Sequence, residues 1–237
     1  MKNKTIFIVS GIFVLIMLTM LCLILWGPSN LVAEFEFSSV VLCFAFSMIF
    51  VCCSSKVWLT ETALLFTTIA DLFLEIIHPM NQIVAMIAFS TVQLLYFTRL
   101  FLELSKKWKI VNLSIRVALV AVVEILTFVL LKDKYDFLSA ISMFYITNLI
   151  SNIVLAFFEF KKSPLLAFGL LLFLGCDIVV GLQCAIGVYI DVPTTSILYQ
   201  ISHTSFNISW LCYLPSQTLI ALSVAKSRLD FSKEKIK

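Results

Sequence analysis

Residues 164–189 read PLLAFGLLLFLGCDIVVGLQCAIGVY and contain a single charged residue, Asp177. A helix needs about 20 predominantly apolar residues to cross the hydrocarbon core of a bilayer, so this run is long enough to span it. Elsewhere the chain is similar, because 61% of all residues are hydrophobic, 13% are charged and the mean hydropathy is +1.07. Soluble domains are about 45–50% apolar and about 25% charged, and disordered chains are more polar still. The composition excludes both classes and predicts a polytopic membrane protein.

The other apolar runs extend this prediction to an all-α bundle of eight transmembrane helices in one integral membrane domain, residues 1–237. The expected helices are 5–26, 36–54, 57–77, 82–103, 110–131, 136–159, 164–189 and 198–225. The first is assigned to the membrane because it is too long for the core of a signal peptide, and no clear cleavage site follows Trp26. The last is too long for one straight span, so we expect it to begin with an interfacial segment around Thr194 to His203.

The basic residues between and beyond these helices test the count. Two of them, Lys132 and Lys134, fall on one side of the membrane. Thirteen fall on the other side: Lys2, Lys4, Lys56, Lys106, Lys107, Lys109, Lys161, Lys162, Lys226, Arg228, Lys233, Lys235 and Lys237. By the positive-inside rule, this asymmetry predicts a multi-pass protein of the cell membrane with both termini cytoplasmic. The net charge of +3 is too small and too scattered to indicate a nucleic-acid partner.

Three carboxylates, Asp71, Glu124 and Asp177, fall in the middle of predicted helices. An ionisable side chain at that depth costs at least about 2.5–3.5 kcal/mol, which makes each one a candidate for a functional site. At the rise of an α-helix, Asp71 and Asp177 both lie about 21 Å from the cytoplasmic ends of their helices, with Glu124 at a similar level. We therefore expect the three to line one cavity. The alternative is a structural contact between helices, which explains Glu124 equally well.

Uncharged polar residues also fall in mid-helix. They are Gln93, Tyr96, Tyr145, Asn148, Asn152, Asn207, Tyr213 and Gln217. Residues three or four apart on a helix share a face, as Gln93 and Tyr96 do. Taken singly, each is explained by an interhelical hydrogen bond worth about 0.6 kcal/mol. Together they predict a polar chamber inside an apolar bundle.

Several chemistries lack the residues that they need. The only two histidines, His78 and His203, are expected near the outer surface, so a three-histidine zinc site within the membrane is excluded. No lysine lies in mid-helix, and no G-x-S-x-G, H-E-x-x-H or Walker sequence occurs. The seven cysteines lie in apolar runs without metal-type spacing. We expect neither a metal nor a cofactor, which leaves carboxylate chemistry or transport.

Both aspartates lie in segments that resemble the signatures of one family. Gly169–Asp177 is similar to G-x-x-x-F-x-x-S-D, with Cys176 in place of the serine. Ala70–Leu74 is similar to G-D-x-x-L, with Ala70 in place of the glycine. The two segments fall on the third and seventh predicted helices.

Two further segments carry the same resemblance. Phe89, Gln93 and Tyr96 have the spacing of F-x-x-x-H-x-x-Y, with glutamine in place of the histidine. Tyr213–Ile220 is similar to Y-x-x-x-Q-x-L-I. Together the four segments cover residues 57 to 225 in order, and they resemble the YhhN-like lysoplasmalogenase family of eight-helix membrane proteins.

The resemblance implies a hydrolase of lipid metabolism that cleaves the vinyl ether bond of a lysophospholipid, with a membrane lysolipid as its partner. Asp71 and Asp177 are the implied catalytic residues. Protonation of the alkene carbon needs a carboxylic acid, and a second carboxylate would stabilise the cation or activate water. The sequence leaves open which aspartate is the acid. The expected substrate-binding residues are Gln93, Tyr96, Glu124, Asn148, Tyr213 and Gln217.

Two other functions use the same residues differently. A small transporter or proton-coupled carrier would use the buried acids as a relay. Paired helices interrupted by glycine or proline, which are typical of transporter sites, are not found, because Gly175 and Pro215 are isolated. In a structural protein, the acids would make buried contacts only.

Overall fold

The computed structural model describes residues 3–50, 55–186, 192–202 and 207–234. The elements formed by these residues are helical, and eight of the helices are long and apolar enough to cross a membrane. This confirms the predicted count of spans. The protein is therefore a multi-pass α-helical membrane protein.

Nine α-helices and three short helical turns follow one another along the described residues. The α-helices are α1 (Asn3–Trp26), α2 (Val32–Met48), α3 (Ser55–Asp71), α4 (Gln82–Leu102), α5 (Lys106–Leu131), α6 (Phe137–Phe158), α7 (Pro164–Ala185), α8 (Ile197–Ser202) and α9 (Ile208–Glu234). The turns are η1 (Ser29–Leu31), η2 (Leu72–Ile76) and η3 (Lys132–Lys134). Of these, η2 is a π-helical turn that directly follows Asp71, and such turns occur frequently at functional sites.

Four helices begin earlier than the sequence predicted, α1 and α3 by two residues and α2 and α5 by four. Helix α2 begins at Val32 because the carboxylates that follow, Glu34 first, are compatible with the positive end of the helix dipole. Helix α5 begins at Lys106 because its lysines favour helix even where the apolar run has not yet started. The expected helix ends at residues 54 and 189 lie outside the described residues.

The last predicted run, residues 198–225, is divided in the structure, as its length predicted. A short helix, α8, occupies part of the segment expected at the interface, and the spanning helix α9 begins only at Ile208. His203 lies outside the described residues. Helix α9 also continues to Glu234, because Lys226 and Arg228 support helix beyond the apolar stretch.

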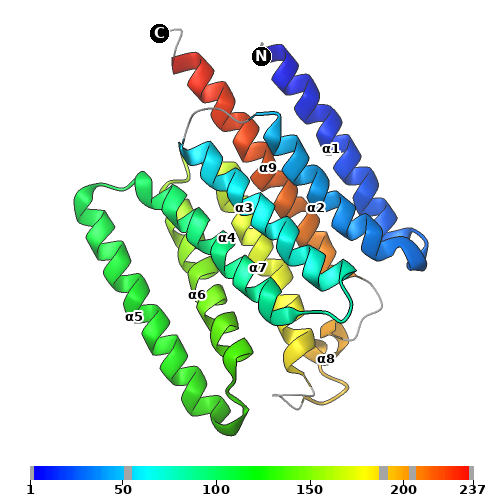
Figure 1. The fold of residues 1–237 in the computed structure, drawn as a ribbon, viewed down its shortest axis with the longest axis vertical. Coiled ribbons are helices and arrows are strands. Elements are labelled where there is room, and N and C mark those ends of the chain that lie inside the picture. Colours follow the sequence, from blue (N-terminus) through cyan, green and yellow to red (C-terminus); the bar gives the residue numbers. More distant parts are fainter. Residues whose placement is uncertain (1–2, 51–54, 187–191, 203–206, 235–237) are drawn as a thin grey trace.

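Five of the spans close into a ring. Helix α3 packs against α4, α4 against α6, α6 against α7, α7 against α9, and α9 against α3. Helices α1 and α2 cover α9 and α3 from outside, whereas α5 stands beside α6 on the other flank (Figure 1). The start of α1 and the end of α9 lie at the same end of the molecule, as an even number of spans requires (Figure 1).

Glycine permits a close contact between α7 and α9. A Cβ atom on Gly169 would lie 2.7 Å from Cγ1 of Ile220 and 3.2 Å from the carbonyl oxygen of Ser216. Small residues let membrane helices approach closely, which is a main source of packing energy where the hydrophobic effect is absent. This approach holds α7, with Asp177, against α9, with Tyr213.

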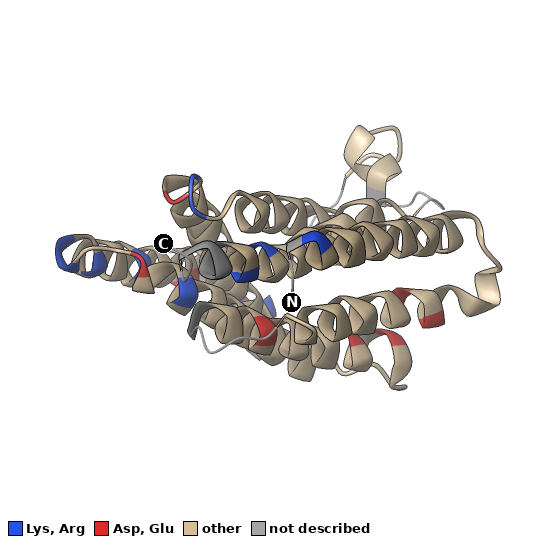
Figure 2. Cartoon of the chain, turned by 90° about the horizontal axis from the view of Figure 1, so that it is seen from above, with Lys and Arg blue, Asp and Glu red and all other residues tan. Residues whose placement is uncertain are grey.

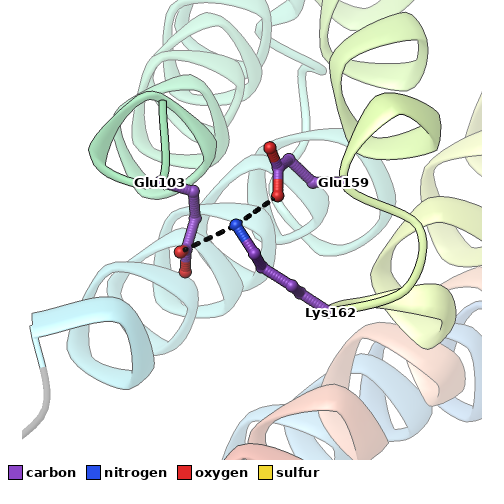
Figure 3. A network of polar contacts seen from close by, with 3 residues as sticks. All are labelled: Glu103, Glu159 and Lys162. Carbon is purple, nitrogen blue, oxygen red and sulfur yellow. Dashed lines mark ion pairs between the residues drawn. The ribbon is translucent and has the colours of Figure 1, made fainter. Parts of the chain in front are cut away.

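Charged residues gather at the end of the bundle where the chain begins and finishes. Figure 2 shows Lys and Arg beside both labelled chain ends. At the same end, the Lys162 ammonium lies 2.6 Å from Glu159 and 3.7 Å from Glu103, so it links the ends of α4 and α6 (Figure 3). The hydrogen bond to Glu159 raises the pKa of Lys162 above its ordinary value, because it stabilises the charged ammonium.

Candidate active site

Each aspartate accepts a hydrogen bond from a tyrosine across the ring. The hydroxyl of Tyr213 on α9 donates to Oδ2 of Asp71 at 2.6 Å, and the hydroxyl of Tyr145 on α6 donates to Oδ2 of Asp177, also at 2.6 Å. These lengths are typical of hydrogen bonds between a hydroxyl and a carboxylate. Asp71 and both tyrosines are buried, and Asp177 is half-buried. Each bond occupies one oxygen of its carboxyl group and leaves the other for chemistry.

The two tyrosine–aspartate pairs lie together in the interior of the ring. Asp71 and Asp177 are close enough to interact electrostatically. The ring of Phe173, on α7, packs edge-on against Tyr213 and Tyr145, with centroids 5.4 and 6.5 Å apart. Four of the five helices of the ring thus converge on one position, as the equal depths of the aspartates predicted.

Two further carboxylates extend this group. Glu36 on α2 and Glu75 on η2 interact with each other, and both interact electrostatically with Asp71. Glu36 is buried and accepts a hydrogen bond of 2.6 Å from Nδ2 of Asn207. Glu36 was not predicted as a site residue, since a carboxylate near a helix N-terminus is ordinarily assigned to solvent and the helix dipole. Glu75 lies four residues after Asp71, on the same face of the helix, and this spacing indicates that the two carboxylates are neighbours.

One face of α4 presents polar atoms to the interior. Ser90 Oγ, Gln93 Nε2 and Tyr96 Oη are all buried, and none has a hydrogen-bond partner within the described residues. On α9, Ser216 Oγ and both polar atoms of the Gln217 side chain are in the same situation. An unmade buried hydrogen bond costs about 1–3 kcal/mol, so such a cluster needs an explanation. A bound polar ligand or water would supply the missing partners.

Beside this face lies a buried arginine held by amides. Arg116 on α5 donates from Nη1 to Oδ1 of Asn148 and from Nη2 to Oδ1 of Asn152, both at 2.8 Å. The guanidinium carbon lies 4.0 Å from the centre of the Phe97 ring. The Asn148 amide also donates to the carbonyl of Phe144, so both of its polar groups are occupied. Asn148, expected to bind substrate, therefore holds Arg116.

Glu124 does not join the aspartates. It is half-buried near the other end of α5, where its carboxylate accepts a hydrogen bond of 3.0 Å from the hydroxyl of Tyr135. Helix α5 packs against α6 and η3 outside the ring. Glu124 therefore lies away from the ring interior, although it was predicted at the same depth as the aspartates. The other predicted residues, Gln93, Tyr96, Tyr213 and Gln217, lie in the ring with both aspartates.

A metal site would need at least three suitable side chains close together. Within the described residues, no three His, Cys, Asp or Glu side chains are arranged to hold a metal ion.

Fold and site together define a polytopic membrane protein with a pair of tyrosine-bonded aspartates on the helices of a five-helix ring. Comparison with protein families gives the particular class. The chain belongs to the YhhN family, whose model matches residues 31–224. That range contains every residue of the ring interior named above. No curated protein and no solved structure shows significant similarity to the chain.

Proposed function

We propose that the protein is an intramembrane hydrolase that cleaves the vinyl ether bond of a lysoplasmalogen. The observation that carries the proposal is the proximity of Asp71 and Asp177, each bonded to a tyrosine, inside the ring. Membership of the YhhN family is consistent with it. The substrate is a membrane lysolipid, and neither a metal nor a cofactor is required.

The reaction divides between two carboxyl groups. One, as the acid, protonates the alkene carbon remote from the ether oxygen, which leaves an oxocarbenium ion. The other, as a carboxylate, stabilises that cation and accepts a proton from the water that attacks it. The hemiacetal so formed collapses to a fatty aldehyde and the glycerophospho-alcohol. Overall one water is consumed, and the proton that the second carboxylate took from it passes to the first carboxylate and restores the acid.

The neighbouring side chains suit these steps. The hydroxyls of Tyr145 and Tyr213 orient the carboxyl groups and stabilise negative charge on them. Aromatic rings attract a cation over their faces, and Phe173 lies between the two tyrosines. The unpartnered groups of Tyr96 and Gln217 are available to position the water or the glycerol hydroxyl.

The orientation follows from the distribution of charge. We propose that the end carrying both termini and the Lys162 ion pairs faces the cytoplasm of the cell membrane, because basic residues favour that side. Reporter fusions after Lys237 and within residues 106–109 should then report cytoplasm, and a fusion near Pro28 should report the exterior. An exterior signal at Lys237 would contradict this orientation.

A proton-coupled carrier is the second candidate. One observation favours it: the carboxylates Glu36 and Glu75 continue from Asp71 toward the outer end of the bundle, as a proton path would. The two functions separate in detergent solution. An enzyme should release fatty aldehyde from lysoplasmalogen when purified in detergent micelles, whereas a carrier needs a sealed vesicle. Uptake into proteoliposomes without turnover in micelles would overturn the hydrolase proposal.

A further inference from the structure

Arg116 differs from the other buried arginine. Arg99 contacts hydroxyl groups of Thr60 and Ser223 and interacts electrostatically with Glu103. Arg116 is 5% exposed, yet its partners among the described residues are two neutral amides and an aromatic ring. A buried cation held by neutral groups is expensive, which indicates a role beyond packing.

The chemistry of arginine fixes the direction of the hydrogen bonds around it. A guanidinium only donates, so the oxygen of the Asn152 amide must face Arg116 and its nitrogen must face the other way. There Nδ2 of Asn152 donates to the backbone carbonyl of Gln93 at 2.8 Å and to its Oε1 at 3.0 Å. Amide orientations are ordinarily ambiguous, but here the donor-only arginine removes the ambiguity.

Gln93 stands at the end of this series with a free donor. Its one side-chain acceptor is taken by Asn152, so Nε2 has to point elsewhere, and it is buried with no partner in the described part of the chain. One turn earlier on α4, Phe89 packs against the rings of Tyr145 and Phe173, each with a centroid distance of 5.9 Å. The free donor therefore lies one helical turn from the rings that flank the aspartates.

We infer that Arg116 is a positioning residue that acts through Asn152 to present Nε2 of Gln93 as a hydrogen-bond donor to an oxygen of the bound lysolipid. The identity of the ligand rests on the proposed function, whereas the direction of the series rests on the contacts alone. The oxygen is one that can only accept a hydrogen bond, either the ether oxygen or a phosphate oxygen of the lipid. A neutral histidine at position 93 would offer the same pattern, with one nitrogen accepting from Asn152 and one N–H directed at the ligand.

Asn152→Asp is the decisive variant. An aspartate keeps the contact with Arg116, and strengthens it to an ion pair, but it has no hydrogen to donate when ionised. The Gln93 amide then has to turn round, so that Nε2 donates to the aspartate and Oε1 faces the ligand oxygen. We expect the detergent melting temperature to be retained while ligand affinity falls at least about tenfold, because a hydrogen bond is replaced by two opposed acceptors.

The measurement is equilibrium binding to the full-length protein in detergent. The probes are a saturated 1-O-alkyl lysophosphatidylethanolamine, which has no vinyl ether to hydrolyse, and the matching 1-O-alkylglycerol, which has no phosphate. Gln93→Leu should lose about two- to tenfold in affinity, and Gln93→His should bind within about twofold of the parent. Combining Gln93→Leu with Asn152→Asp should cost no more than the larger single loss, because both act on one donor.

Each outcome decides the inference. A loss for both probes supports it with the ether oxygen as the acceptor, and a loss for the phospholipid probe alone supports it with the phosphate. Parent-like binding by Asn152→Asp, or a parent that binds neither probe, would overturn it. Turnover by the parent with unaltered binding in Asn152→Asp would refute this role of Arg116 and leave the hydrolase proposal standing. The expected binding pattern without any turnover would support this role of Arg116 and refute the hydrolase proposal.

Discussion

Removing one tyrosine hydroxyl from the ring interior should lower turnover far more than removing a similar tyrosine hydroxyl outside the ring. In Tyr213→Phe the ring keeps its edge-on contacts with Phe173 and Trp210, at centroid distances of 5.4 and 4.9 Å. The lost atom is the donor of the 2.6 Å hydrogen bond to Asp71. A hydrogen bond to a charged group is worth about 1.5–3 kcal/mol. At about 1.4 kcal/mol per factor of ten, turnover should fall roughly ten- to a hundredfold.

The assay is release of fatty aldehyde from lysoplasmalogen by the purified protein in detergent, with the melting temperature measured in parallel. Tyr135→Phe is the matched control, because it removes the tyrosine–carboxylate bond between Tyr135 and Glu124 at the end of α5, outside the ring. We expect the control to hydrolyse substrate at the parent rate. If Tyr213→Phe also kept more than half of the parent rate, the hydroxyl would have no part in catalysis and the reasoning about Asp71 would fail.

Three further predictions concern the fold and its surroundings. Gly169→Val should lower stability by about 1–3 kcal/mol, read as a drop in melting temperature, because its first added carbon would meet Ile220 at 2.7 Å; unchanged melting would show that α7 and α9 can separate freely. Lys162→Met should cost less than about 1 kcal/mol, because the ammonium is largely exposed and such pairs are weak. The stability that the raised pKa of Lys162 supplies is present at neutral pH and is lost as the pH rises through that pKa, so an equal loss at alkaline pH in Lys162→Met would contradict the assignment. Glu124→Gln should leave turnover unchanged, and a tenfold loss would return Glu124 to the site.

The aspartate pair could be predicted because depth along a helix follows directly from residue number. Asp71 and Asp177 were predicted at equal distances from the basic ends of their helices, and in the structure they are close enough to interact electrostatically. Tyr213 and Gln217 were indicated by the same reasoning together with the resemblance to known signatures. Polar residues are easily recognised in an apolar run, so most residues of the ring interior could be predicted from the sequence.

The position of a residue in the plane of the membrane could not be predicted in the same way. Glu124 and Arg116 lie two turns apart on α5, which packs outside the ring. Arg116 nevertheless contacts Asn152 of the ring, whereas Glu124 accepts a hydrogen bond from Tyr135. Glu36 was missed because its role depends on α2 covering α3, where η2 brings Glu75 beside it. Which helices become neighbours depends on close contacts such as that at Gly169, and hydropathy carries no information about them.

The most direct test of the central claim is vinyl ether hydrolysis by Asp71→Asn and Asp177→Asn, each purified in detergent. Asparagine keeps the shape of the side chain but can neither deliver a proton nor carry the charge that stabilises a cation. Asp133→Asn is the matched control, since Asp133 lies exposed on η3, outside the ring. We expect both ring variants to melt near the parent temperature and to release no detectable aldehyde, with the control at the parent rate. Parent-like turnover by either ring variant would contradict a catalytic role for that aspartate and with it the proposed mechanism.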